Sequence, residues 1–556
     1  MNRNTNTHFA LNPTKLDMSR STFNRSHSVK TSFNVGDIVP FFCDEVLPGD
    51  TFDITTSKVV RMPSLLTPIM DNLYLDVYYF FVPNRLVWSH WRELMGENTQ
   101  SAWIPTVEYQ VPQITSPASS GWSVGTIADY FGIPTGIAGL SVNAMPFRAY
   151  ALICNEWFRD ENLSDPLNIP VDDATVAGVN TGTFVTDVAK GGKPYKAAKY
   201  HDYFTSCLPS PQKGPDVKIP VAAGGKTPVV ALNEFADPNA LGVGSYPLVN
   251  AVFLDGSRSL YTAKSINNAN SKVTDISSLS VVPSGGTDLT PMNLFAVDQN
   301  PVAATINQLR MAFQIQKLYE RDARGGTRYI ELLKSHFGVT SPDARLQRPE
   351  YLGGNRIPIV IDEVNQTSGT VSNGTPQGNP TGQSRTTDVH HDVKKSFVEH
   401  GFLIGVMVAR YEHTYQQGLE RFWSRKDRFD YYWPVFANIG EQAVLNKEIY
   451  CDGSSKDNEV FGYQEAWADY RYKPNRVTGE MRSSAAQSLD IWHLADDYSA
   501  LPSLSSSWIN EDSSPVNRVI AVSEENSNQL WCDIYVKNKC TRPMPLYSIP
   551  GLIDHH

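Results

Sequence analysis

Hydrophobic and polar positions alternate with a period of two near the start of the chain, which is the pattern of half-buried β-strands. Strand patterns begin at Phe33, with an apolar-rich run over 38–46 and an alternating run over 51–62. The run 72–83 (NLYLDVYYFFVP) is rich in Tyr, Phe and Val and has too little polar alternation for an exposed face. We therefore expect a central strand there, and the spacing of the three runs predicts an antiparallel sandwich or barrel.

A second pattern has the period of a helix and follows Pro301, since proline is favoured at the first helical position. Apolar side chains recur every three or four positions, at Val302, Ile306, Leu309 and Phe313. The pair Gly325-Gly326 predicts the end of this helix, and a shorter helix is expected over 328–337, ending at Gly338. By themselves these residues favour a buried helix pair with a solvated, charged end.

Two segments of different character lie between these patterns. Helical pieces are expected over 84–95 and from Pro146 onwards. Residues 175–290 are dominated by Ala, Gly, Ser, Thr, Val and Asn, with short β runs and many turns, which predicts an exposed, β-rich insertion. A last strand pattern covers 530–538. The expected parts are therefore an arm over 1–32, a β fold with a helical insertion over 33–174, the insertion over 175–290, and the rest of the β fold over 291–556.

Composition narrows the class of protein. The chain has 556 residues, of which 41% are hydrophobic and 11% aromatic, with 36 prolines, and this favours a loop-rich β protein over a helical bundle. The formal net charge of −10 argues against a protein whose whole surface binds nucleic acid. No run of apolar residues is long enough for a transmembrane helix, so no membrane span is expected. The six cysteines form no C-x-x-C pair, which favours free thiols over a disulfide scaffold.

The arm over 1–32 differs in charge from the rest of the chain. Up to residue 30 it has one acid, Asp17, and five basic residues, namely Arg3, Lys15, Arg20, Arg25 and Lys30. The simplest interpretation is a surface terminus without specific contacts. The alternative is an inward-facing arm whose basic side chains lie near nucleic-acid phosphates and bind them without sequence preference.

The candidate motifs for binding or converting small molecules lack residues that such motifs require at fixed spacings. Gly225-Lys226-Thr227 resembles the end of a phosphate-binding loop, but Pro220 stands where that loop needs a glycine, and Pro228 follows where a helix should start. The pairs His390-His391 and His555-His556 have no metal-ligand spacing around them. No G-x-S-x-G motif occurs. We therefore expect no catalytic residues, no metal and no cofactor.

Several long strings carry a family resemblance. They are SRSTFNRSHSVKTSFNVGDIVPFFCDEVLPGDTF (19–52), NLYLDVYYFFVPNRLVWSHWRELMGEN (72–98), ERDARGGTRYIELLKSHFGVTSPDARLQRPEYLGG (320–354), FGYQEAWADYRYKPNRVTGEMRS (461–483) and IPGLIDHH (549–556). In this order they resemble the major capsid proteins of microviruses, the small icosahedral single-stranded DNA phages, and within them the gokushovirus branch. The resemblance covers most of the chain and is weakest over 175–290.

The resemblance implies a mainly β fold, namely an eight-stranded antiparallel jelly-roll barrel of the viral capsid type with large loop and helical insertions. It implies a T=1 icosahedral shell of about 60 copies around circular single-stranded DNA. It also implies that residues 175–290 form protrusions at the threefold axes for host attachment. The implied partners are a scaffolding protein, a pilot protein, a small basic DNA-binding protein and a host receptor, with assembly in the cytoplasm of the bacterial host. The basic partner suits a chain of charge −10.

The aromatic, charged loop over 461–482 has no regular period and is a candidate contact between subunits. Tyr463, Trp467 and Tyr470 are its expected anchors, because aromatic side chains dominate protein interfaces. Packing within the subunit is an equally good interpretation of the same residues.

Two other functions remain open at this stage. A β-rich glycoside hydrolase would need two carboxylates in an exposed cleft, and a secretory leader would be expected for it, whereas residues 1–21 have no apolar core. A receptor- or carbohydrate-binding phage spike would suit the composition of 175–290, but fibre-like repeats are not visible. Self-assembly into closed shells separates the capsid hypothesis from both.

Overall fold

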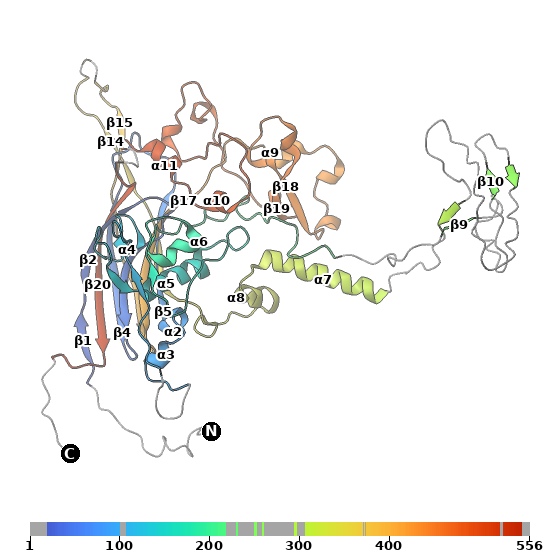
Figure 1. Ribbon diagram of the computed structural model, residues 1–556. Coiled ribbons are helices and arrows are strands. Elements are labelled where there is room, and N and C mark those ends of the chain that lie inside the picture. The colour runs from blue at the N-terminus through green and yellow to red at the C-terminus, as the bar shows by residue number, and fades with distance from the viewer. Residues whose placement is uncertain are drawn as a thin grey trace, which may run out of the picture. The chain divides into compact units, whose positions relative to one another are not determined.

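The computed structural model describes residues 19–99, 107–217 and 306–547, apart from 371, 373 and 523–525, together with four short strands between 229 and 296 (Figure 1). The chain forms two compact units, one of residues 1–213 with 320–556 and one of residues 214–319. In the second unit, β9 (Val229–Ala231) pairs with β12 (Leu294–Ala296), and β10 (Asn250–Val252) pairs with β11 (Arg258–Leu260).

Two antiparallel sheets form the framework of the first unit. In the first sheet, β20 (Leu530–Arg542) pairs on one side with β1 (Ser21–Asn24) and β2 (His27–Phe33) and on the other with β4 (Thr51–Arg61), which in turn pairs with β16 (Thr386–Ser396). The second sheet has the order β13 (Glu350–Pro358), β5 (Leu73–Pro83), β17 (Gly401–Tyr411) and β3 (Val39–Val46). The run 72–83 is therefore a central strand, as its composition predicts.

The main hydrophobic core lies between the two sheets. Alternate side chains of β4 and β20 are buried in it, such as Phe52, Ile54, Ile534 and Val536. The side chains between them face outward, so the first sheet has one buried face and one exposed face. Gly353 marks the place where the edge strands of the two sheets come together, because a Cβ on it would lie 2.0 Å from the carbonyl oxygen of Asp392.

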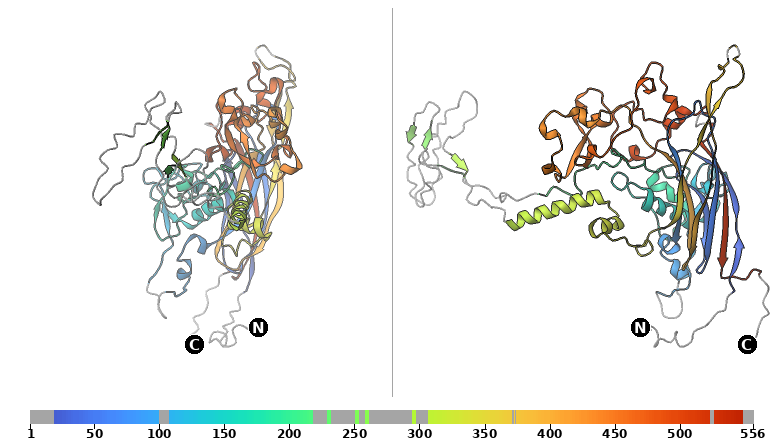
Figure 2. Two further views of the ribbon diagram at one scale, coloured as in Figure 1. Left: turned by 90° about the vertical axis from the view of Figure 1, so that its right-hand side faces the viewer. Right: turned by 180° about the vertical axis from the view of Figure 1, so that it is seen from behind.

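The two central strands of the second sheet, β5 and β17, are buried on both faces, which explains why they lack polar alternation. The outer face of this sheet packs against the insertion that follows β5, and Phe80, Val82 and Ile404 meet Trp88, Phe147 and other buried side chains of that insertion there. The helical insertion lies on the side of the unit away from β2 and β20 (Figures 1 and 2). The insertion contains α2 (Asn84–Val87), α3 (Trp91–Leu94), α4 (Ile127–Tyr130), α5 (Met145–Ile153), η1 (Cys154–Phe158), α6 (Phe184–Asp187), η2 (Val188–Lys190) and a small sheet of β6 (Gln113–Thr115), β7 (Ser141–Asn143) and β8 (Val176–Ala177).

A third core supports the segment between β17 and β20. It contains Phe204, Tyr415, Ile449, Phe461 and Trp508. The elements around it are short: η4 (Arg421–Ser424), η5 (Arg428–Asp430), η6 (Pro434–Phe436), β18 (Glu441–Leu445), α9 (Asn446–Ile449), η7 (Ser455–Asn458), β19 (Val460–Glu465), η8 (Ala468–Tyr470), η9 (Gly479–Met481), η10 (Asp490–Trp492), α10 (Ser506–Ile509) and α11 (Ser514–Val519). The hairpin β14 (Ile361–Asn365) and β15 (Pro380–Ser384) precedes β16.

The predicted helix pair forms, but its predicted burial is wrong. Helix α7 (Ile306–Gly325) is followed by Gly326 at a φ of 90°, and α8 (Tyr329–Leu332) continues into η3 (Leu333–Phe337) before Gly338. Among the described side chains of α7 only Ala323 is buried, and Ile306 and Phe313 are exposed. A helical pattern of apolar residues predicts that one face of the helix packs against a partner. The pattern does not show whether that partner belongs to the same chain or to another one.

Three boundaries differ from the expectations. Strands begin at Ser21 rather than at Phe33, because the polar strands β1 and β2 find backbone partners in β20. The expected helix over 84–95 is broken between α2 and α3. Residues 175–213 belong to the first unit, where Val188 and Tyr195 are buried in its core, so the separate unit begins at Gly214 and not at residue 175.

Candidate functional site

The largest concentration of exposed aromatic side chains lies in residues 421–439, here called the aromatic segment. Its backbone forms three short 3-10 turns, η4 to η6. Trp423 is 66% exposed and Val435 86% exposed, and the other exposed apolar side chains are Phe422, Phe429, Tyr431, Tyr432, Trp433 and Ile439. Exposed apolar groups in such number mark interaction sites rather than ordinary protein surface.

The aromatic segment is held in place by the turn that follows β19. Trp467 is 5% exposed, and its indole N–H donates to the carbonyl oxygen of Phe436 at 2.9 Å. The ring of Tyr432 packs edge-on against Trp467, with a centroid distance of 5.8 Å. Arg425 pairs with Asp469 and lies 4.3 Å from the ring centre of Tyr470. These contacts order the backbone and leave the other side chains of the segment exposed.

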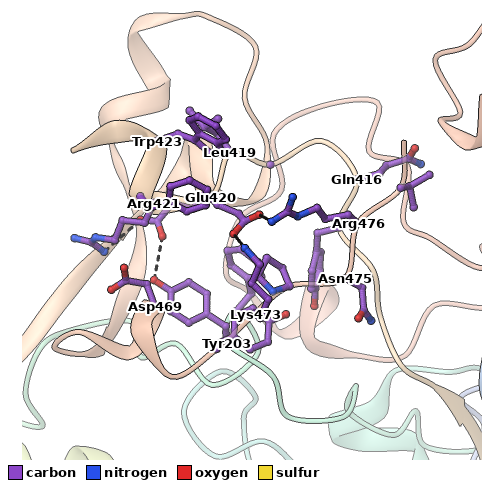
Figure 3. A pocket seen from close by; sticks show the side chains of 18 of the residues that line it. Tyr203, Gln416, Leu419, Glu420, Arg421, Trp423, Asp469, Lys473, Asn475 and Arg476 are labelled. Carbon is purple, nitrogen blue, oxygen red and sulfur yellow. Dashed lines mark hydrogen bonds and ion pairs between the residues drawn. The ribbon is translucent and has the colours of Figure 1, made fainter. Parts of the chain in front are cut away.

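A cavity of about 640 Å³ adjoins the aromatic segment (Figure 3). Aromatic rings of Phe422, Trp423, Tyr470 and Tyr472 line it, together with six basic residues, Arg421, Arg425, Arg471, Lys473, Arg476 and Arg482, and three acids, Glu420, Glu448 and Asp469. Glu420 lies between Lys473 and Arg476, as the labelled side chains show (Figure 3). Ring faces beside arginines are the usual composition of a surface that binds a polypeptide.

The acids of this cavity are held in ion pairs and hydrogen bonds. Glu448 accepts a hydrogen bond from the hydroxyl of Tyr203 at 3.0 Å and lies 3.3 Å from Arg421. Burial raises the pKa of Glu448 despite that arginine. The paired acids therefore stabilise the walls of the cavity, and the cavity is suited to binding a partner.

The three residues predicted as inter-subunit anchors differ in how exposed they are. Tyr470 is 51% exposed and lines the cavity. Trp467 is buried within the chain, and Tyr463 is half-buried in β19, where its backbone pairs with Leu208. Sequence reasoning missed the aromatic segment itself, although RFWSRKDRFDYYWPVFANI holds seven aromatic residues in nineteen positions. That density was the available signal, and it was overlooked because the segment has neither a helical nor a strand period.

The basic residues predicted near DNA have partners within the chain where they are described. Arg25 lies 2.7 Å from the carboxylate of Asp44, which is 9% exposed, and Arg20 donates to the carbonyl oxygen of Gly49. Lys30 lies 3.7 Å from Asp533 on the exposed face of the first sheet. Arg3 and Lys15 lie outside the described residues.

The adjacent histidines His390 and His391 each lie beside a carboxylate, and the predicted pair His555-His556 lies outside the described residues. His390 lies 2.8 Å from Asp392, and His391 lies 3.0 Å from Asp53. Within the described ranges, no group of three or more His, Cys, Asp or Glu side chains is arranged to hold a metal ion.

None of the helices in the described part of the chain is long and apolar enough to span a membrane.

One buried cluster has a polar composition like that of a catalytic site. His413 lies between the carboxylates of Asp496 and Glu511, and all three side chains are buried. Burial alone would lower the pKa of His413, but the two carboxylates outweigh it and raise the pKa to about 9. Because the cluster is enclosed, we interpret it as an internal ion network that stabilises the fold.

Comparison with known proteins decides the family. The model of the family described as "Capsid protein (F protein)" matches residues 13–552. The chain belongs to this capsid protein family. The capsid protein VP1 of Spiroplasma virus 4 is 44% identical over 538 residues, covering 96% of this chain and 95% of the relative. VP1 of Bdellovibrio phage phiMH2K is 42% identical over 538 residues, covering 96% and 95%, and VP1 of Chlamydia phage 1 is 41% identical over 586 residues, covering 96% of each chain.

The expected resemblance to microvirus major capsid proteins of the gokushovirus branch is therefore confirmed. This capsid protein is a structural component of the virion and not an enzyme. The hypotheses of a glycoside hydrolase and of a spike protein are wrong. For a capsid protein, the aromatic segment and its cavity are the candidate contact surface between neighbouring subunits.

Proposed function

We propose that this capsid protein assembles into a closed T=1 icosahedral shell of about 60 copies around the circular single-stranded DNA of a small bacteriophage. The observation that carries the proposal is the aromatic segment, whose exposed rings need a protein partner. A second copy of the same chain is the partner that shell symmetry supplies. Tyr470, beside the segment, is the predicted anchor that remains available for such a contact.

We also propose that the two sheets form an eight-stranded antiparallel jelly-roll barrel. The support is the path of the chain: β2, β4, β16 and β20 belong to the first sheet, and β3, β5, β13 and β17 to the second. Consecutive strands change sheet at every step except between β5 and β13. This path, with sheet orders β2-β20-β4-β16 and β3-β17-β5-β13, is the connection expected of a jelly roll.

The assembly proposal is tested by sedimentation and electron microscopy of the protein from cells that make it with its neighbouring phage genes. Sixty copies of a 61.8 kDa chain amount to about 3.7 MDa of this protein. Icosahedral particles of at least that mass are expected. A slow species of one to three chains, in the presence of every partner gene, would overturn the proposal.

We propose that residues 214–290, the part of the insertion predicted over 175–290 that falls in the second unit, form the protrusions at the threefold axes and engage a receptor on the host. Their separation as a compact unit and their small, polar composition support an exposed role. Particles in which residues 218–300 are replaced by a short Gly/Ser linker should still form and should lose adsorption to host cells. Unchanged adsorption would contradict the attachment role.

The basic residues Arg3, Lys15, Arg20, Arg25 and Lys30 are proposed to lie near the genome, alongside the small basic DNA-binding protein, the scaffolding protein and the pilot protein. Arg3 and Lys15 give the cleanest test, because Arg25 is engaged by Asp44. We expect R3Q/K15Q particles to package less DNA, measured as the ratio of absorbance at 260 and 280 nm. Full packaging with full infectivity would dispose of the role for these two residues.

A further inference from the structure

The outward face of the first sheet, here called the open face, combines exposed aromatic rings with basic side chains. It consists of the outward side chains of β2, β4, β16 and β20, which alternate with buried ones. It lies on the side of the unit away from the helical insertion (Figures 1 and 2). A face that only needed solubility would carry small polar and charged groups, yet this one also displays large aromatic rings.

The aromatic rings stand on β20, in the middle of the face. Trp531 is 44% exposed and Tyr535 is 48% exposed. Trp531 and Tyr535 are four positions apart on the same strand, so their Cα atoms lie about 13 Å apart. The same outward row continues with Lys537 and Lys539, both exposed. Rings followed by ammonium groups on one strand present both a stacking surface and charge to a ligand that is flat and anionic.

The neighbouring strands extend this arrangement. Arg61 on β4 stands opposite Trp531, and Lys394 on β16 stands opposite Asp53, which itself pairs with Lys539. A shallow depression of about 290 Å³ lies beside Tyr535. Its other lining residues are Ser57, Lys58, Val59, Thr387, Asp388, Val389 and Asp533. Its volume is near the lower end for small-ligand pockets, which suits a single planar ring.

The charge of the open face is opposite to that of the whole chain. Its outward charged residues are five basic ones, Lys30, Arg61, Lys394, Lys537 and Lys539, and two acidic ones, Asp53 and Asp533. Both acids have basic neighbours, since Lys30 lies 3.7 Å from Asp533 and His391 lies 3.0 Å from Asp53. The face is therefore positive in a chain of net charge −10, so it attracts an anionic ligand and repels a basic protein.

We infer that the open face binds single-stranded DNA, with bases stacked on Trp531 and Tyr535 and phosphates held by Lys537, Lys539 and their neighbours. This inference rests on the proposed enclosure of a single-stranded genome. Stacking on aromatic rings with lysines along the backbone is how proteins bind single strands without sequence preference. A duplex would not bind in this way, because its bases are already stacked on one another.

The test uses the full-length, unassembled chain and a fluorescein-labelled thirty-nucleotide oligo(dT), with anisotropy read at several salt concentrations. We expect W531A/Y535A to weaken binding roughly tenfold or more, since each stacked base contributes substantially to affinity. We expect K537Q/K539Q to lower the slope of log affinity against log salt by about 1.4, from two lost phosphate contacts. Binding should also quench tryptophan fluorescence in the wild type and quench it less in W531A/Y535A.

The matched control is K193Q/K456Q, which removes two exposed lysines away from the open face and should leave both affinity and salt slope unchanged. Circular dichroism and thermal unfolding of each variant show whether it is folded. Y535S, which removes a single exposed ring, repeats the test if the double aromatic variant unfolds.

Equal oligonucleotide affinity of wild type, W531A/Y535A and K537Q/K539Q would overturn the inference. Unchanged DNA binding combined with lost binding of another virion protein would also overturn it and assign the face to a protein partner. Particle formation is measured separately by sedimentation, so failure of the shell proposal and failure of DNA binding are distinguishable. Shells of K537Q/K539Q that form normally and hold less DNA are the result expected if both proposals hold.

Discussion

Nε2 of His413 lies 2.8 Å from Oε1 of Glu511, and neither side chain is exposed to solvent. Nδ1 of the same ring lies 3.0 Å from the carboxylate of Asp496. A ring whose two nitrogens both face carboxylates is stable there as imidazolium, because both nitrogens then donate. This ion network joins the end of β17 to two distant loops of the chain.

The charge of His413 makes the stability of the subunit depend on pH. The pKa of His413 is about 9 in the fold, against 6.5 for an ordinary histidine. A raised pKa means that the stabilisation is fully present below pH 6.5 and is lost as the pH rises through 9. Its size is roughly 3 kcal/mol, from the shift in pKa. Urea unfolding of the unassembled chain from pH 6 to pH 10 should show this decline.

Replacing His413 by Gln should remove that pH dependence and destabilise the subunit. Gln carries no charge, so the buried Glu511 would lose its cation and Asp496 would keep Lys199, whose Nζ lies 3.9 Å from the Asp496 carboxylate, and the loss should cost roughly 3–5 kcal/mol at pH 6. The exposed His201 provides the control, and H201Q should unfold like the wild type. If H413Q kept the wild-type slope between pH 6.5 and pH 9, another group would be responsible for it.

Asp76 should give a dependence of the opposite sign. This buried carboxylate accepts hydrogen bonds from Arg356 at 2.7 Å, Arg410 at 2.5 Å and Tyr200 at 2.9 Å, so it links three strands of the second sheet. Burial acts to raise its pKa, but the two arginines and Tyr200 together lower it. A lowered pKa means that the stabilisation is present above pH 3.8 and is lost as the pH falls through the folded value.

The substitution D76N leaves the two arginines without their carboxylate and should cost roughly 3–5 kcal/mol in urea unfolding at pH 7. The exposed Asp362 in β14 is the matched position, and D362N should be neutral. Equal stability of D76N and D362N would mean that solvent replaces the buried carboxylate.

Gly353 should tolerate no side chain. A Cβ there would lie 2.0 Å from the carbonyl oxygen of Asp392, so the edge strands β13 and β16 would have to separate. We expect G353A to lower the free energy of unfolding by about 1–3 kcal/mol, as overpacked sites do. Gly369 has no atom within 4 Å of its Cβ position, so G369A is the control and should be neutral.

The aromatic segment should matter for assembly and not for folding. Trp433 and Val435 are exposed, so W433S/V435S should change the free energy of unfolding of the unassembled chain by less than about 0.5 kcal/mol. The same variant should fail to sediment as particles, because a contact between copies is lost. V398S removes a comparably exposed valine at the turn before β17 and should assemble normally. Normal particles from W433S/V435S would exclude the segment as a shell contact.

The sequence was informative where local pattern and burial agree. Alternation along 530–538 predicted a half-buried strand, and the composition of β5 predicted a central one. The glycines after α7 and η3 predicted where both helices end, because a left-handed residue stops a helix whatever surrounds it. The family followed from long strings, not from any single motif.

Relationships between distant residues could not be predicted in this way. His413 is 83 residues from Asp496 and 98 from Glu511, and no spacing rule connects them. The strand β2 (HSVKTSF) is too polar to be recognised before its partner β20 is known. Arg25 looked like a free basic side chain until the fold brought Asp44 beside it. The burial of α7 also depends on which partner packs against its apolar side chains, and the helical pattern does not identify that partner.

The position of β20 affects when the subunit can fold. This strand contains residues 530–542 and pairs with both β2 and β4, which come much earlier in the chain. The first sheet therefore lacks this inner strand until the ribosome has synthesised β20, and β2 has no strand partner in the sheet during that time. Only a chain that extends through β20 can close the sandwich. Synthesis of β20 thus acts as a checkpoint that keeps chains truncated before it out of the shell.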